Sequence, residues 1–349
     1  MTKVDIQAFV KAMPKADLHC HVVGAMRPDT LDALAAKHRV PLGKPARELY
    51  AFDDFYGFID VLRLAGTVLR DRDDFARLAY EAIEDGFLRG NLRHVEFMFD
   101  PQYFYPAGVS YRTAVDGLCE GLDRARRDFG VSGLLIACID RQIDPSAAME
   151  IMDDILAYRR DEVVGIGLDG PERAGPPQLF GEVYRVAAKA GLKRTAHCCE
   201  DNQTLIEAPP RHYAICRDLL HCDRIDHGYN LLADDDMVRR ARDDGLFFTA
   251  CGVTSMKKNL VRRRESIDRM VKHGLRVTLN TDDPAMFKTD IAHSCALLFE
   301  HLGWGLEDAR RFSLAGIEGS WLDDAAKREM RATFASELDR LERSMGEAR

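Results

Sequence analysis

The sequence has no apolar run that approaches the roughly 20 residues needed to span a bilayer. Its first residues, MTKVDIQAFVKAMPKADLHCH, hold no apolar core followed by a small-residue cleavage site, so we expect no signal peptide. A basic stripe is also missing, because Lys and Arg are scattered among Asp and Glu and the net charge is −8. These absences argue against membrane and nucleic-acid partners.

A disulfide framework is equally absent. The nine cysteines are an odd number and show no repeating CxxC spacing. Disulfides persist in oxidising compartments, whereas unpaired cysteines suit a reducing one, so we expect a cytoplasmic protein. The content of 46% hydrophobic and 30% charged residues is typical of a globular chain with a large core. Nothing in this composition argues against a homo-oligomer.

What the sequence does have is a recurring unit, in which a short apolar run ends in a polar residue or glycine and precedes a helical segment. Eight such runs are four to eight residues long, as is typical of strands buried on both faces. They cover residues 16–21, 94–100, 133–140, 163–170, 192–198, 224–228, 246–251 and 276–282. Helix-period segments such as 145–160 and 178–190 lie between them.

Eight βα units in one chain predict an α/β fold, a closed parallel (β/α)8 or TIM barrel, as one domain over residues 1–349. The alternative, a doubly wound open sheet, is disfavoured because no strand is followed by a GxGxxG loop. The first and second strands are separated by a much longer gap than the others. We therefore expect residues of about 27–90, including AFDDFYGFIDVL at 51–62, to form extra helices over the C-terminal mouth. Residues 305–349 are predicted to form helices on the outside.

Histidines and acids fall at the ends of the predicted strands. His19 and His21 are two apart on the first strand, so the alternation of side chains points both to one face. The ends of the fifth, sixth and eighth strands carry His197, His227 and the pair Asp282-Asp283. In a TIM barrel the C-terminal strand ends converge where the active site lies. Three imidazoles and a carboxylate, with an open position for water, form a catalytic zinc site.

Five segments resemble the adenosine/adenine deaminase family of the amidohydrolase superfamily. They are PKADLHCH near the start, VVGIGLDGPE on strand four, HCCED on strand five, RIDHGYN on strand six and LNTDDP on strand eight. The similarity covers about residues 14–315. It implies a zinc-dependent hydrolase that removes the exocyclic amino group of a 6-aminopurine and releases ammonia and the 6-oxopurine.

The resemblance also implies roles for single residues. The zinc ligands would be His19, His21, His197 and Asp282, and the catalytic set Glu200, His227 and Asp282. Glu200 would protonate the ring nitrogen N1, for which burial raises a carboxyl pKa in the needed direction. His227 would orient and deprotonate the attacking water. Asp283 would accept a hydrogen bond from the imidazole part of the purine, and Gly170 would donate its backbone N–H to N3.

Three departures from the family pattern bear on the substrate. The family's HAGE becomes HCCE, and we interpret Cys198 and Cys199 as small apolar fillers rather than as thiolate ligands. The family's CPxSN after strand seven becomes CGVTS at 251–255. The carboxylate that contacts ribose in nucleoside deaminases is replaced by Val23. An apolar Val23 in the substrate site favours adenine or an N6-substituted adenine over a nucleoside.

Several alternatives stay open or are weighed against this hypothesis. The enzyme could be an adenosine deaminase that acts on the nucleoside or a modified nucleoside. A binuclear amidohydrolase is disfavoured because strand four ends in GLDG without the lysine that bridges two metals, which favours one Zn²⁺ per chain. The zinc deaminases with HxE and PCxxC motifs are not matched. An inactive purine-binding barrel should have lost a ligand or the acid, and none is lost.

Overall fold

The computed structural model describes residues 5–347, and within this range all strand pairs are parallel. The strands are β1 (Lys15–His21), β2 (Leu92–Phe99), β3 (Ser132–Asp140), β4 (Val163–Asp169), β5 (Lys193–Arg194), β6 (His197–Cys198), β7 (Arg224–His227), β8 (Phe247–Cys251) and β9 (Arg276–Asn280). They form the sheets β1-β2-β3-β4-β5 and β6-β7-β8-β9. The predicted strand 192–198 is thus broken into β5 and β6.

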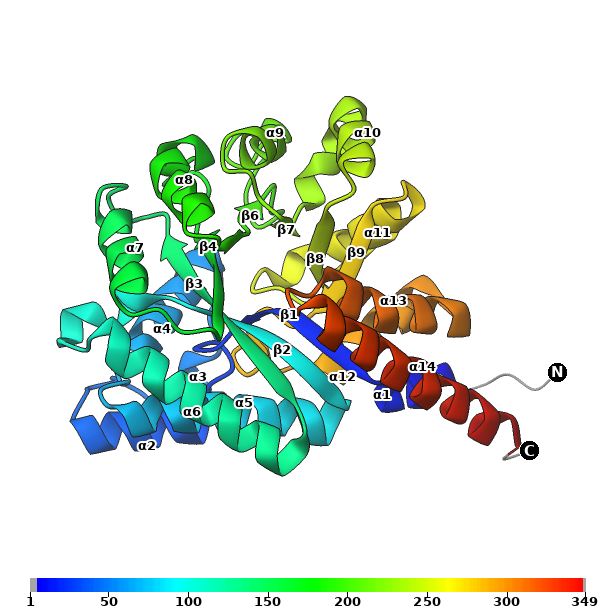
Figure 1. Cartoon of the computed structure of the whole chain (residues 1–349), viewed down its shortest axis with the longest axis horizontal. Coiled ribbons are helices and arrows are strands. Elements are labelled where there is room, and N and C mark those ends of the chain that lie inside the picture. Colours follow the sequence, from blue (N-terminus) through cyan, green and yellow to red (C-terminus); the bar gives the residue numbers. More distant parts are fainter. Residues whose placement is uncertain (1–4, 348–349) are drawn as a thin grey trace.

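Backbone hydrogen bonds join these two sheets into one ring. Between β5 and β6, Thr195 N donates to Ile166 O over 3.0 Å, and Asp226 N donates to Ala196 O over 3.0 Å. The ring closes between the first and last strands, where Cys20 and Asp282 form a parallel bridge. The predicted TIM barrel is therefore confirmed, with β5 and β6 sharing one of its eight strand positions (Figure 1).

Helices surround the ring of strands (Figure 1). They are α1 (Ile6–Ala12), α2 (Pro28–His38), α3 (Ala46–Leu49), α4 (Phe55–Gly66), α5 (Arg72–Gly90), α6 (Tyr111–Phe129), α7 (Ala147–Ala157), α8 (Gly181–Lys189), α9 (Arg211–Asp218), α10 (Asp235–Asp244), α11 (Leu260–Lys272), α12 (Ile291–Leu302), α13 (Leu306–Gly319) and α14 (Asp324–Glu347). Their apolar residues recur at helical spacing and face the core: in α6, Val115, Leu118 and Leu122 are all buried. None of the helices in residues 5–347 combines the length and apolar character needed to cross a membrane.

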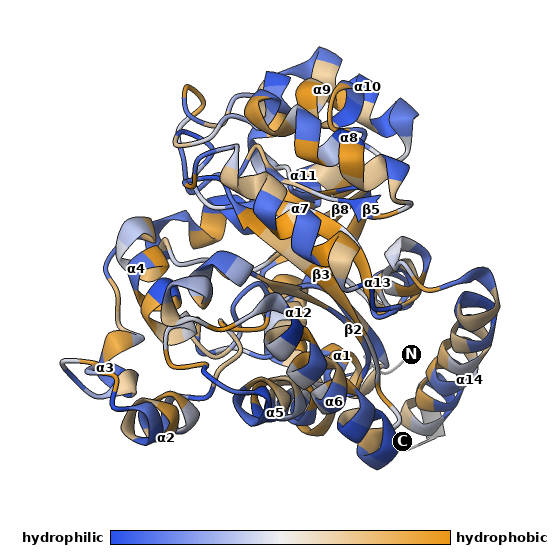
Figure 2. Cartoon of the chain, turned by 60° about the vertical axis from the view of Figure 1, so that its left-hand side comes forward, coloured by the Kyte–Doolittle hydropathy of each residue, from blue (hydrophilic) through white to orange (hydrophobic). Residues whose placement is uncertain are grey.

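The segment expected to cover the mouth divides into two parts. Helix α4 contributes buried Phe55, Phe58 and Leu62 to the walls of a cavity at the mouth of the barrel. Helix α5 instead packs against α6, α12 and β2 in the outer layer, directly before β2. Figure 2 shows α2, α3 and α4 on the side of the molecule opposite α14. The apolar face of α4 therefore covers the mouth, whereas α5 belongs to the ring of outer helices.

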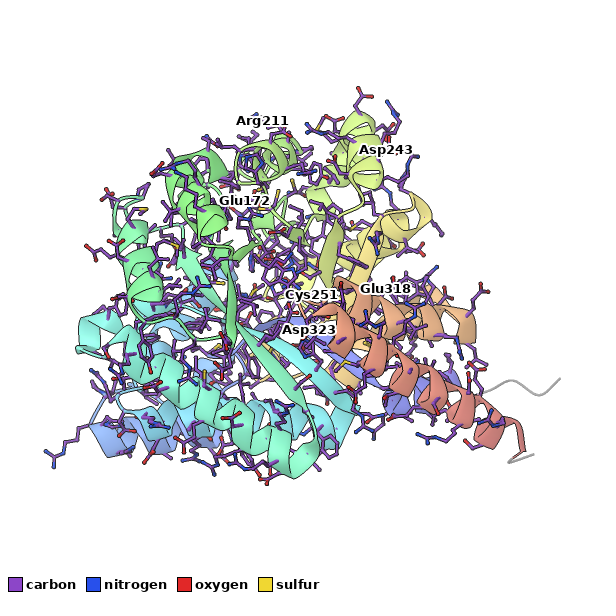
Figure 3. All side chains as sticks on the ribbon, viewed as in Figure 1. Glu172, Arg211, Asp243, Cys251, Glu318 and Asp323 are labelled. Carbon is purple, nitrogen blue, oxygen red and sulfur yellow. The ribbon has the colours of Figure 1, made fainter. Side chains whose placement is uncertain are left out.

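The C-terminal segment predicted as 305–349 forms α13 and α14. Helix α13 packs against β1 and β9, and α14 lies against α13. Residues 1–4 and 348–349 of the predicted single domain lie outside the described residues. Side chains crowd the interior of the ring (Figure 3).

A buried ion pair crosses the ring between β2 and β7. Arg224 Nη1 lies 2.5 Å from Glu96 Oε2, and Arg224 Nη2 donates to Leu18 O over 3.0 Å. The guanidinium also lies 4.2 Å from the centre of the Trp321 ring. Although burial acts in the opposite direction, Arg224 and His94 hold the pKa of Glu96 below its usual value.

Arg224→Met should destabilise the barrel, because it leaves the Glu96 carboxylate buried without its partner. We expect the free energy of unfolding to fall by about 3–5 kcal/mol. Urea denaturation of the purified variant measures this quantity. The double variant Glu96→Gln/Arg224→Met removes both charges and should recover much of the loss; an unchanged stability of the single variant would contradict the ion-pair role.

Candidate metal centre and active site

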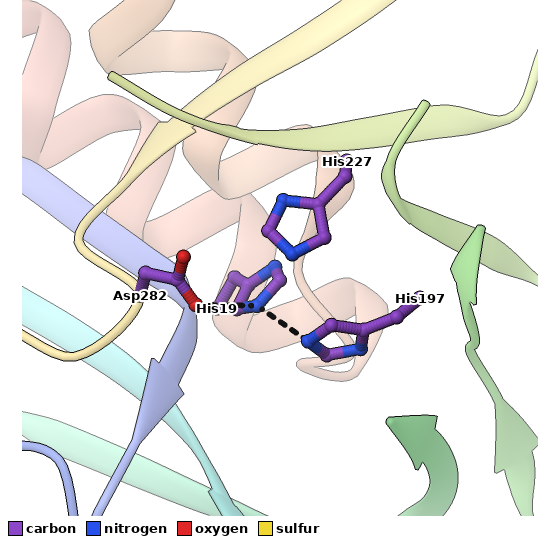
Figure 4. A group of neighbouring side chains, drawn as sticks. All are labelled: His19, His197, His227 and Asp282. Atoms are coloured by element: carbon purple, nitrogen blue, oxygen red, sulfur yellow. Dashed lines mark hydrogen bonds and ion pairs between the residues drawn. The ribbon is translucent and has the colours of Figure 1, made fainter. Parts of the chain in front are cut away.

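Four donor atoms meet at the carboxyl ends of β1, β6 and β9. His197 Nε2 lies 3.1 Å from His19 Nε2 and 3.1 Å from His21 Nε2. Asp282 Oδ1 lies 3.3 Å from His19 Nε2 and 3.7 Å from His21 Nε2. Figure 4 shows His19, His197 and Asp282 pointing toward one another, with His227 above them. The structure thus brings together all four residues that the resemblance assigns to zinc.

This donor set fits a metal ion. Ligand atoms about 2.0–2.1 Å from a tetrahedral zinc lie about 3.4 Å from each other, close to the spacings found here. Burial, together with His197 and His19, lowers the pKa of His21 to about 3, so its imidazole is neutral, the form that binds metals. Three imidazole nitrogens cannot all satisfy one another by hydrogen bonds at this distance. A cation among them would accept all three lone pairs.

His227 lies close enough to belong to the same group. The ligand atoms of His19, His197, His227 and Asp282 are all within 4.8 Å of one another. The His227 ring is also near the acid, because its Nε2 lies 3.7 Å from Glu200 Oε1. Burial lowers the pKa of His227 well below its usual value, so its ring is neutral. It can accept a proton from a water held between the donor set and Glu200.

Behind the donor set, Asp226 of β7 holds two of the imidazoles. Asp226 Oδ2 lies 3.5 Å from His197 Nδ1, and Asp226 Oδ1 lies 3.8 Å from His19 Nδ1. Thr249 joins this contact, since its Oγ1 lies 2.9 Å from His19 Nδ1 and donates to Asp226 Oδ1 over 2.7 Å. Such partners fix the orientation of metal-binding histidines and raise their basicity.

The backbone is left-handed at three positions of the site that are not glycine. The φ angle is +55° at Cys199, +68° at His227 and +69° at Asp282. Side chains with a Cβ atom rarely adopt this conformation, and it persists where the surroundings fix the backbone. Cys199 therefore occupies a glycine-like position, as expected where the family has glycine. Its thiol is buried, 3.3 Å from that of Cys198, and donates to Pro209 O over 3.3 Å.

Glu200 follows these cysteines and is buried beside the donor set. Burial raises the pKa of its carboxyl to about 7. Oxygen Oε1 accepts hydrogen bonds from Asn202 Nδ2 over 2.6 Å and from Arg263 Nη2 over 2.8 Å. A carboxylic acid that keeps its proton near neutral pH can act as a general acid.

One small cavity connects the acid with the donor set. The walls combine apolar residues of α4 and two loops with polar groups from the strand ends. They are His21, Phe55, Phe58, Ile59, Leu62, Tyr103, Asp169, Gly170, His197, Glu200, Asn202, His227, Asp282, Asp283 and Phe287.

Two of the three predicted substrate-binding residues line this cavity. Gly170 has a φ of +77°, and a Cβ there would lie 2.8 Å from Asp140 Oδ1, so the position requires glycine. Asp283 is buried, and burial together with Asp282 raises its pKa well above the usual value. Val23 is buried in the apolar core, and the described residues that line the cavity do not include it.

The sequence analysis assigned no role to several residues near the site. Asp226 and Asp169 stand inside recognised motifs, and Asp169 Oδ2 lies 3.8 Å from His21 Nδ1. For these two residues, the position inside a motif was the available signal. No motif pointed to Asn202 or to Arg263, which lies on α11, beyond the segment CGVTS that departs from the family pattern.

A second, larger cavity of about 320 Å³ is also present. Its walls include Asp17, Cys20 and Thr281, together with residues of α5. Asp17 accepts a hydrogen bond from Thr281 Oγ1 over 2.5 Å. None of the histidines of the donor set lines this space, so the cavity at the mouth is the candidate active site.

Comparison with known proteins agrees with this geometry. Residues 14–337 match the sequence profile of the family described as adenosine deaminase. The chain belongs to the adenosine deaminase family. Among its relatives in that family, the adenine deaminase of Cupriavidus metallidurans is 31% identical over 95% of this chain and 92% of its own. The adenine deaminase of Schizosaccharomyces pombe is 31% identical over the same shares of the two chains.

Solved structures of the family extend the likeness to three dimensions. An amidohydrolase from Burkholderia ambifaria, determined with bound Zn, has a TM-score of 0.90 and 36% identity, covering 97% of this chain and 94% of its own. The adenine deaminase of Arthrobacter aurescens has a TM-score of 0.84 and 32% identity, covering 94% and 99%. The family expected from the five sequence segments is confirmed.

The donor set predicts one zinc ion per chain. Metal analysis of protein purified without chelator should find about one equivalent, and His197→Ala should lose it. Asp226→Asn should weaken zinc affinity by about 10–100-fold, because it disturbs the partner of two ligands. Competition with a chelator measures this affinity. Metal-free protein with full deaminase activity would disprove the assignment.

Proposed function

We propose that this protein is a zinc-dependent hydrolytic deaminase of a 6-aminopurine, with adenine or an N6-substituted adenine as the preferred substrate. One observation carries the proposal: a buried carboxyl group with a pKa of about 7 shares a small cavity with a buried set of three histidines and an aspartate. Hydrolysis of an amidine requires an acid and a metal-activated water in the same cavity. The likeness to adenine deaminases supports the choice of substrate.

Within the proposed reaction, His19, His21, His197 and Asp282 hold the metal. Zinc supplies Lewis-acid activation when bound, lowering the pKa of a water molecule toward about 7. His227 lies beside the donor set and orients this water while taking its proton. The contacts of Asp226 and Thr249 keep the imidazoles in place during the reaction.

Glu200 handles the proton on the purine. Attack of water at C6 breaks the aromaticity of the ring and places electron density on N1, which accepts the Glu200 proton. The amino group accepts the proton that His227 took from the water, the C6–N bond breaks and ammonia leaves. The C6 hydroxyl group returns its proton to Glu200, and the carbonyl of the 6-oxopurine remains. Asp283 and Gly170 both line the cavity, where they can bind the imidazole edge and N3 of the ring.

The shape and polarity of the cavity support a free base. Phe55, Phe58, Ile59 and Leu62 of α4 form an apolar cover, and the described lining residues include neither Lys nor Arg. A phosphate would find no cation among these walls. Ribose hydroxyls would lose hydrogen bonds to water against the apolar cover, and each unpaired group costs about 1–3 kcal/mol. Because Val23 lies in the core, this preference rests on α4 rather than on Val23.

Location and partners complete the proposal. All nine cysteines are free and buried, which suits a reducing compartment such as the cytoplasm. The net charge of −8 disfavours binding to nucleic acid. A small-molecule purine is the partner that the cavity supports, and assembly of copies of the chain stays open.

Glu200→Gln should abolish most turnover while zinc content stays unchanged, because an amide cannot donate and recover the proton. Loss of a general acid lowers kcat by about 10²–10⁴-fold. Ammonia release from adenine measures kcat, and metal analysis of the same sample is the control. His227→Ala should be comparably damaging. A near-wild-type rate for Glu200→Gln would show that another group delivers the proton.

The free base should be the better substrate. We expect kcat/KM for adenine or N6-methyladenine to exceed that for adenosine by at least about tenfold, or roughly 1.4 kcal/mol in the transition state. Side-by-side kinetics with the zinc-loaded protein measure the ratio, and adenosine monophosphate tests the missing phosphate contact. Higher kcat/KM for adenosine would show that polar groups near α4 bind the ribose.

A further inference from the structure

Arg263 of α11 stands directly behind the catalytic acid. Its guanidinium is fully buried, and its Nη2 donates to Glu200 Oε1 over 2.8 Å. The same group bonds Asp201, through Nε over 2.8 Å and Nη2 over 2.5 Å to Oδ1. It also lies 4.6 Å from the centre of the Tyr229 ring. Arg263 is not among the cavity walls, so it acts on the site through Glu200.

Asn202 supplies a second donor to the same oxygen of Glu200. Its Nδ2 lies 2.6 Å from Oε1. Thr254 Oγ1 donates to Asn202 Oδ1 over 2.7 Å, which fixes the amide with its NH₂ group toward Glu200. Within residues 5–347, no group donates a hydrogen bond to Glu200 Oε2. An oxygen that accepts two N–H donors is a poor site for a proton, so Oε2 is the oxygen that carries it.

The charges in this cluster favour the same arrangement. One guanidinium lies between two buried carboxyl groups, those of Asp201 and Glu200. The cluster is neutral when Asp201 is ionised and Glu200 keeps its proton. A buried cation without Asp201 would instead favour the ionised form of Glu200. Asp201 therefore allows Arg263 to donate a hydrogen bond to the acid without removing its proton.

We propose that Arg263, neutralised by Asp201, is a positioning residue that holds Oε1 of Glu200 so that the protonated Oε2 faces the purine N1. This inference rests on the proposed function of Glu200. It adds to the active site an ion pair between α11 and the loop that follows β6. Misplacing a reacting group by about 1 Å can cost about 10²-fold in rate.

The test uses zinc-loaded Arg263→Met, Arg263→Lys and the double variant Arg263→Met/Asp201→Asn, assayed with adenine. The double variant removes both charges and guards against a loss of folding caused by an unpaired Asp201. We expect kcat to fall by about 10–100-fold in Arg263→Met and in the double variant, with KM nearly unchanged and zinc retained. Arg263→Lys keeps the charge and one donor and should recover part of kcat.

Arg262→Met is the matched control. The neighbouring Arg262 is largely exposed; its Nη2 donates to the main-chain oxygen of Asp201 over 2.8 Å and lies 3.9 Å from Asp201 Oδ2. Within residues 5–347 it makes no hydrogen bond or ion pair with Glu200, so kcat should stay within about twofold of wild type. Retained kcat in Arg263→Met and in the double variant would overturn the proposal. A loss of kcat that persists fully in Arg263→Lys would also overturn the proposal. The same holds for a loss of kcat that accompanies a loss of zinc.

A crystal structure of the double variant separates this proposal from the proposed function. We expect the Glu200 carboxyl group to have left its place near His227, a result that does not depend on turnover. Glu200 found in its wild-type position would overturn the positioning role. Wild-type protein that releases no ammonia from any aminopurine would refute the proposed function, and the position of Glu200 in the variant would then decide this proposal alone.

Discussion

The closure of the barrel by its first and last strands is the constraint on which the site depends. His21 N donates to Asp282 O over 2.8 Å, and Asp282 N donates to His19 O over 2.9 Å. These two hydrogen bonds bring together residues that are more than 260 positions apart in the chain. They place the Asp282 carboxylate beside the imidazoles of His19 and His21. The third imidazole, that of His197, comes from β6. Without closure, the donor atoms would belong to separate edges of an open sheet.

Burial then gives the grouped side chains their chemical character. It lowers the pKa of His21 to about 3 and raises that of Glu200 to about 7. In both cases the low dielectric penalises the charged form of the group. A neutral imidazole binds a metal, and a protonated carboxyl group donates a proton. Two opposite pKa shifts thus follow from one physical cause and serve one reaction.

Two charged side chains behind the site, Asp226 and Arg263, have buried partners. Asp226 faces His19 and His197, and Arg263 faces Asp201 and Glu200. The left-handed backbone at Cys199, His227 and Asp282 sets the direction of the chain at the site. The surrounding strands hold this unfavourable geometry through the ladder of backbone hydrogen bonds. Stability of the barrel and geometry of the site are therefore linked at the same residues.

The sequence by itself determined the strand pattern, the barrel and the family, because buried parallel strands and the motifs HCH, HCCE and DHG are local in the chain. It also predicted which histidines and which aspartate would converge, since all carboxyl ends of a parallel barrel lie on one face. Only the tertiary structure decided which neighbours complete the site. Val23 turns into the core, α5 joins the outer layer, and Arg263 reaches Glu200 from a helix 63 positions away. Contacts between distant segments depend on packing, and no local pattern of residues encodes them.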